Sequence, residues 1–160
     1  AWRADSIGYA TEPFTARSGF QRVRDVDPAT ALRRALPMAA RWLAGEADVP
    51  APAGSLGGAA AAEGLAELVE TGLEPWQHDH LGYFAIRVGA RRLSDASACL
   101  AFIGESKAAS IAGEQARLVG AMQYPLVTGD RITLARLLRR LAPTYEQLRA
   151  SLPGGLPGQP

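Results

Sequence analysis

The sequence has 160 residues, which is about the length of one domain. Hydrophobic residues make up 48% and charged residues 21%, a balance that excludes a disordered chain and is enough for one sizeable core. A formal net charge of +1 argues against nucleic-acid binding, and a single cysteine excludes an internal disulfide. No apolar run is long enough to span a membrane and no signal peptide opens the chain, so we expect a cytoplasmic protein.

The first 26 residues show no helical periodicity but carry several large apolar side chains. These are Trp2, Ile7, Tyr9, Phe14 and Phe20. Each large apolar side chain left in water costs free energy, so this many of them argue against a free tail. We therefore expect residues 1–26 to form an extended arm packed on the domain, with a short strand over 19–26.

The rest of the chain is rich in strong helix formers, chiefly Ala, Leu, Arg and Glu. Asp27 followed by Pro28 predicts the start of the first helix. An apolar stripe along this helix continues to Leu43, and the helix is expected to end at Gly45. Residues 46–58 form a loop rich in Pro, Gly and Ala. Further helices are expected over 59–71, 74–93 and 96–122, the last of these broken near 104 or 113, and from Asp130 to Leu152. Prolines at 37 and 143 predict kinks.

These patterns predict an all-α fold: a compact bundle of five or six antiparallel helices. We expect residues 1–152 to form a single domain and residues 153–160 a disordered tail. The helix over 74–93 is apolar on two sides, with Phe84 on one and Tyr83 on the other, and this predicts that it lies at the centre of the bundle. Cys99, in an apolar stretch, is expected to be buried and inert.

Charge is unevenly distributed along the chain. Residues 46–86 carry seven acidic residues and no Lys or Arg, whereas the segments before and after them are basic. Glu63, Glu67 and Glu70 recur at helical spacing and form an acidic ridge. Two interpretations stay open: the ridge is solvated or pairs with arginines of the same chain, or it binds a partner of opposite charge.

Both histidines lie in the segment Trp76-Gln77-His78-Asp79-His80. His78 and His80 are two residues apart, so they cannot both bind one ion from a regular helix. Glu74 and His78 share a face, which leaves at most two ligands where a closed zinc site needs four. A small-ligand or metal-binding helical domain, with or without enzymatic activity, centred on Glu74, His78 and His80 is therefore the alternative hypothesis.

Residues 74–83, GluProTrpGlnHisAspHisLeuGlyTyr, resemble the short acid–Pro…Asp-His-Leu signature of the all-helical TorD/NarJ chaperones, which mature molybdoenzymes. The resemblance covers ten residues, and the tryptophan-bearing segment of that family is missing downstream. It implies a helical chaperone and does not establish membership.

The sequence contains no phosphate-binding glycine loop, no nucleophile with a paired base and no cluster of metal ligands. We therefore expect no catalytic residue, cofactor or metal, and we expect a non-catalytic helical protein–protein interaction domain: a chaperone, adaptor, immunity-type inhibitor or assembly subunit. The partner is another protein or a second copy, not a nucleic acid or a membrane. Aromatic residues and arginine dominate binding hot spots. The expected partner-binding residues are Glu63, Glu67, Glu70, Trp76, His78, His80, Tyr83, Arg87 and Arg91.

Overall fold

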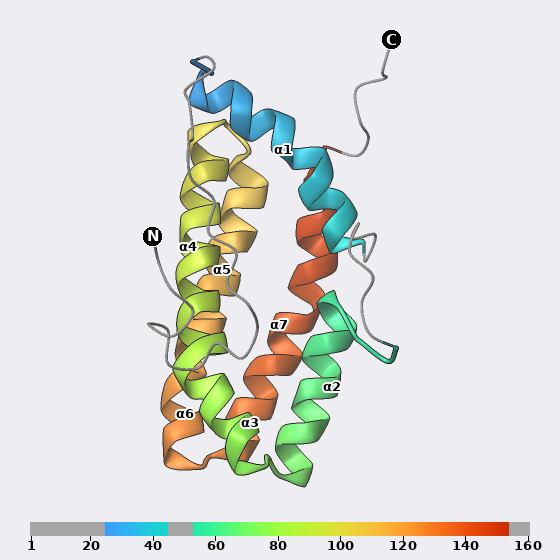
Figure 1. The fold of residues 1–160 in the computed structure, drawn as a ribbon, viewed down its shortest axis with the longest axis vertical. Coiled ribbons are helices and arrows are strands. Elements are labelled where there is room, and N and C mark those ends of the chain that lie inside the picture. Colours follow the sequence, from blue (N-terminus) through green and yellow to red (C-terminus); the bar gives the residue numbers. More distant parts are fainter. Residues whose placement is uncertain (1–24, 45–52, 154–160) are drawn as a thin grey trace, which may run out of the picture.

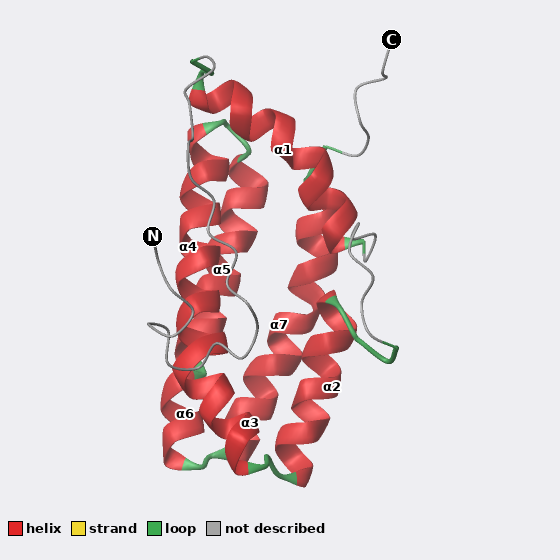
Figure 2. Ribbon diagram, in the orientation of Figure 1, coloured by secondary structure: helices red, strands yellow, loops and turns green. Residues whose placement is uncertain are grey.

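The computed structural model describes residues 25–44 and 53–153 of the chain. Within these ranges the chain forms α-helices and one π-helical segment and contains no strand (Figure 2). The predicted all-α class is thus confirmed for the described part. The predictions for the arm and strand before residue 25, for residues 46–52 of the loop, and for the tail from residue 154 lie outside the described residues.

Seven α-helices follow one another in the described part of the chain (Figure 1). Five have 14 residues or more, and α3 and α6 have six each. Their bounds are α1 Pro28–Leu43, α2 Gly58–Thr71, α3 Pro75–His80, α4 Ile86–Phe102, α5 Ser106–Ala121, α6 Gln123–Thr128 and α7 Arg131–Ser151, with the π-helical segment Leu81–Ala85 between α3 and α4.

The predicted caps form at both aspartates. The Asp27 carboxylate accepts a hydrogen bond from the Thr30 backbone N–H at 2.8 Å, and Asp130 accepts one from Thr133 at 2.9 Å. These bonds lower the pKa of both carboxyl groups, because they favour the ionised form. The predicted starts of α1 and α7 are confirmed, and both helices continue through their internal prolines.

One predicted helix boundary is wrong. The expected break between the helices over 74–93 and 96–122 does not occur, because the chain stays helical without interruption from Pro75 to Phe102. The break comes instead at Gly104, one of the two expected positions. Gly104 has a φ of +87°, which a residue with a side chain rarely adopts.

The hydrogen bonds around Gly104 explain why α4 ends there. Gly104 N–H donates to the Ala101 carbonyl at 3.1 Å, and Glu105 N–H donates to the Leu100 carbonyl at 2.9 Å. This pair of bonds is the Schellman motif, which satisfies the last carbonyls of a helix. The chain can then enter α5 after a short turn.

The central helix is α7. It contacts α1, α2, α5 and α6, while α4 packs along α5, and α1 lies across one end of the molecule (Figure 1). The prediction that the helix over 74–93 is central is therefore wrong. The stripe along α7 that includes Leu134, Leu138 and Leu141 joins the larger hydrophobic core, because these side chains face α2 and α5 together.

The expected burial of Cys99 is also wrong. Its thiol is exposed, whereas the neighbouring Leu100 is buried. Successive helical positions lie about 100° apart, so an apolar sequence context does not determine which side chain faces the core.

Candidate functional site

A cluster of exposed aromatic side chains lies where α3 joins α4. Trp76 is 69% exposed, Tyr83 74% and Phe84 54%. The rings of His80 and Phe84 are in contact, with centroids 5.5 Å apart. Trp76, His80, Phe84 and Arg87 follow one another at spacings of four, four and three, which favours one side of the helix, and Tyr83 is the neighbour of Phe84. We call Trp76, His80, Tyr83, Phe84 and Arg87 the aromatic face.

The aromatic face includes one residue that was not predicted, Phe84, which lies within the π-helical segment Leu81–Ala85. A π turn holds one more residue than an α turn, so every side chain beyond it is rotated relative to a regular helix. Phe84 was expected to point inward, but it is exposed, and Ile86 is buried in the larger core. Phe84 is therefore a site residue that the helical periodicity misassigned.

His78 has a structural contact. Its Nε2 lies 3.2 Å from the Leu126 carbonyl oxygen, so the ring donates a hydrogen bond from α3 to α6. Glu74 N–H donates to the Gln77 side-chain oxygen at 2.8 Å, which stabilises the start of α3. Among the residues with described positions, no group of three His, Cys, Asp or Glu side chains could hold a metal ion.

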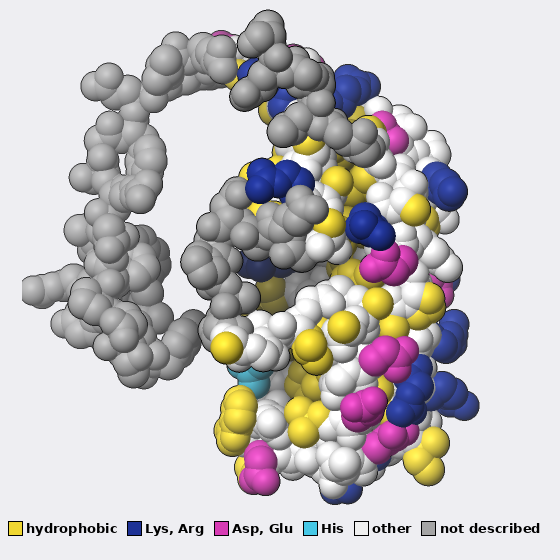
Figure 3. Space-filling view, turned by 90° about the vertical axis from the view of Figure 1, so that its right-hand side faces the viewer, with side chains coloured by type: hydrophobic (Ala, Val, Ile, Leu, Met, Phe, Trp, Pro, Cys, Tyr) yellow, Lys and Arg dark blue, Asp and Glu magenta, His cyan; other side chains and the backbone are white. Residues whose placement is uncertain are grey.

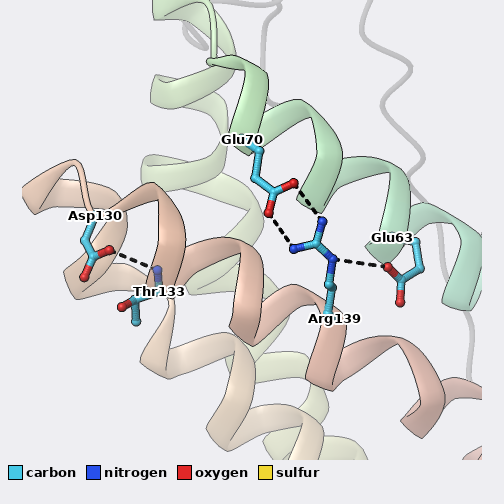
Figure 4. Close-up of polar contacts among 5 residues, drawn as sticks. All are labelled: Glu63, Glu70, Asp130, Thr133 and Arg139. Carbon is cyan, nitrogen blue, oxygen red and sulfur yellow. Dashed lines mark hydrogen bonds and ion pairs between the residues drawn. The ribbon is translucent and has the colours of Figure 1, made fainter.

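The acidic ridge faces α7. Arg139 donates two hydrogen bonds to Glu70, at 2.6 and 2.7 Å, and its Nε lies 3.8 Å from a Glu63 oxygen (Figure 4). The paired guanidinium lowers the pKa of Glu70, and Glu70 in turn raises the pKa of Arg139. Acidic and basic side chains intermingle on this side of the molecule (Figure 3). The structure thus favours the interpretation in which the ridge pairs with arginines of its own chain.

The two predicted arginines of α4 differ in their contacts. Arg91 Nε lies 3.0 Å from both carboxylate oxygens of Asp95, one turn further along the helix. Arg87 is exposed, and no ion pair to it occurs within the described ranges. Of the two, Arg87 is thus the one whose charge is available to a partner.

A second feature, which the sequence did not predict, is an apolar groove of about 550 Å³. It lies between α1, α4, α5 and α7, and its walls include Leu36, Leu100 and Leu148. Cys99 and Tyr145 also line it, and burial raises the pKa of the Tyr145 hydroxyl. The leucine stripe of α1 was visible in the sequence, but the helices that it would meet were not.

None of the described helices combines the length and the apolar character that crossing a lipid bilayer requires. Comparison with known proteins finds no significant match among curated proteins or solved structures. Residues 52–153 match a family model described as the YobF C-terminal domain, and this range includes α2 to α7 with the whole aromatic face. Because the match covers more than half of the chain, the protein belongs to the YobF C-terminal domain family.

Proposed function

We propose that this protein is a non-catalytic helical protein–protein interaction domain that binds its partner through the aromatic face. The observation that carries the proposal is the exposure of Trp76 and Tyr83, 69% and 74%, within one continuous helical stretch. Large apolar groups left in water are costly, and Trp, Tyr and Arg are the side chains most enriched at binding hot spots.

The chemistry of the face indicates what the partner presents. Trp76, Tyr83 and Phe84 fit an apolar patch, and Arg87 at its edge fits a carboxylate. The partner is therefore a protein surface with apolar side chains beside an acidic residue. His78 contributes by its hydrogen bond to Leu126, which fixes α3 against α6 beneath the face.

The acidic ridge has a smaller part in this proposal. Glu63 and Glu70 both lie close to Arg139, so a partner would have to replace contacts that already exist. Glu67 is exposed and makes no ion pair within the described ranges. The ridge therefore contributes to the stability of the α2–α7 contact more than to binding.

In this proposal the aromatic face belongs to a single domain of antiparallel helices. Its support is that α4 packs along α5 after a short turn, and that α2 packs along α7. The alternative function is a metal or small-ligand site at Glu74, His78 and His80. His78 donates to the Leu126 carbonyl through Nε2, which leaves Nδ1 as its one ring nitrogen for a ligand. No observation favours that alternative, and metal analysis of untagged protein tests it.

The experiment compares two double variants with the wild type. Trp76→Ser with Tyr83→Ser removes the two most exposed aromatic rings of the face. Phe102→Ser with Ile132→Ser is the matched control, because these side chains are 65% and 81% exposed and lie outside the face. We expect the first variant to bind the captured partner at least about tenfold more weakly, since hot-spot residues contribute about 2 kcal/mol or more.

The measurement is quantitative capture from a native lysate, followed by affinity determination with the captured protein. Equal affinity of the wild type and both double variants would contradict the proposal. If the aromatic double variant fails to fold, Arg87→Glu provides a second test. This change leaves the apolar groups in place and is expected to weaken binding through charge reversal.

A further inference from the structure

The apolar groove between α1, α4, α5 and α7 is open in the described part of the chain. Cys99 lines it and is nevertheless exposed, and Trp42 on its α1 side is 57% exposed. A groove of about 550 Å³ with leucine walls is unfavourable when it is in contact with water. The volume and the apolar walls of the groove therefore favour an apolar occupant.

The chain already covers part of this surface with residues outside the family match. The match begins at residue 52, so α1 precedes it. Leu36, Ala39 and Leu43 of α1 nevertheless pack against a core cluster formed by the matched helices. Arg33 also donates a hydrogen bond to the Ile103 carbonyl at 3.1 Å, which holds α1 to the end of α4. The region N-terminal to the family match thus acts as a cover for this face.

Three segments of the chain lie outside the described residues, and their compositions differ. Residues 45–52 carry one large apolar side chain, Val49, and residues 154–160 also carry one, Leu156. Residues 1–24 carry several, among them Trp2, Phe14 and Phe20. Only the N-terminal segment has enough apolar surface to fill the groove.

The N-terminal segment also has the required reach. It joins the described chain at Asp25, three residues before α1, and Leu32 in the second turn of α1 already lines the groove. The 16 residues of α1 extend over about 24 Å. The eleven residues from Phe14 to Arg24 span about 35 Å when extended, which exceeds the length of the helix.

We infer that residues 1–24 of this chain occupy the apolar groove between α1, α4, α5 and α7, with aromatic side chains such as Phe14 and Phe20 against its leucines. The covalent tether favours this occupant over a free ligand, because it holds the segment at a high effective concentration beside the groove. This inference concerns a different surface from the aromatic face and does not depend on the proposed function.

Cys99 offers a direct test, because it lines the groove and is the only cysteine. The rate at which N-ethylmaleimide modifies Cys99 is measured in the full-length wild type and in a Phe14→Ser, Phe20→Ser variant. We expect the wild type to react at least about tenfold more slowly than the variant, which corresponds to a groove occupied about nine-tenths of the time. Arg17→Ser with Gln21→Ser is the matched control and is expected to react as slowly as the wild type.

Two results would overturn the inference. A wild-type rate as fast as that of the Phe14→Ser, Phe20→Ser variant would mean that the segment leaves the groove open. Equally slow rates in both would assign the groove to another occupant, a second copy if the rates depend on protein concentration and a small apolar ligand if they do not.

A second measurement covers the case in which the double variant fails to fold. Phe20→Cys adds a thiol that a short bismaleimide is expected to link to Cys99 within one molecule. Val127→Cys, exposed on α6 away from the groove, is the control and is expected to give no such link. Equal linking by both variants, or linking by neither, would contradict the inference.

Discussion

Gln115 is the one fully buried polar side chain of large volume in the described core. Its Nε2 donates to the Thr144 hydroxyl at 3.0 Å, and Thr144 donates in turn to the Leu141 carbonyl. The Gln115 Oε1 atom has no hydrogen-bond partner among the described groups. A buried polar atom without a partner is costly, so this side chain contributes volume and one hydrogen bond and also carries a penalty.

Two substitutions separate the volume of Gln115 from its polarity. Gln115→Leu keeps most of the volume and removes the unpartnered oxygen, so we expect an unchanged or higher melting temperature. Gln115→Ala leaves a cavity between α5 and α7, and we expect a loss of about 2 kcal/mol or more in the free energy of unfolding. Thermal and urea unfolding followed by circular dichroism measure both. A leucine variant as unstable as the alanine variant would show that the amide hydrogen bond matters more than the volume.

At the scale of the element, the glycine that follows α4 and a glycine inside α5 serve different purposes. Gly104 ends α4 with a φ of +87°, and a Cβ there would meet nothing within 4 Å. Gly120 lies inside α5 without a positive φ, and a Cβ there would meet only the Ala90 Cβ, at 3.9 Å. The first glycine is needed for its backbone conformation, whereas the second lowers helix stability without any steric reason.

Alanine at these two positions is therefore expected to have opposite effects. Gly120→Ala should raise the free energy of unfolding by about 0.5–1 kcal/mol, because alanine favours the helix and restricts the unfolded chain. Gly104→Ala should lower it by about 1 kcal/mol or more, because the left-handed conformation is strained for alanine. Chemical denaturation of the two variants measures the difference, and a stabilised Gly104→Ala variant would contradict the assigned role of the turn.

At the scale of the whole molecule, Arg139 joins α7 to α2 through Glu70 and Glu63. The Glu70 pKa lies below its ordinary value of 4.5 because Arg139 favours the ionised carboxylate. A carboxyl group with a lowered pKa stabilises the folded state above its unfolded pKa and loses that contribution as the pH falls through its folded pKa. The contact between α2 and α7 should therefore weaken in acid.

Glu70→Gln tests this dependence. We expect the variant to melt at a slightly lower temperature than the wild type at pH 7, and the difference to disappear as the pH falls below 4.5. Glu67→Gln is the matched control, since Glu67 lies on the same ridge without a hydrogen bond to Arg139 in the described structure, and we expect it to lower the melting temperature at pH 7 less than Glu70→Gln does. A Glu70→Gln difference that stays constant from pH 7 to pH 3 would contradict the role of the Arg139 pair.

The candidate site was predictable only in part, and the reason is geometric. Trp76 and Tyr83 could be selected from the sequence, because aromatic residues near helix starts are recognisable by type. Phe84 could not, because the sequence makes both sides of its helix apolar, and only the packing shows that Ile86 is buried and Phe84 exposed. The apolar groove escaped prediction because its walls come from four helices that are distant in sequence.

The sequence by itself determined the all-α class and the helix starts at Asp27 and Asp130. These features depend on backbone and capping hydrogen bonds that join residues three or four positions apart. Only the tertiary structure decided that Glu70 pairs with Arg139, 69 residues away, and that Cys99 faces an open groove. These contacts depend on how whole helices pack, because each helical face can bury its apolar side chains against more than one neighbour.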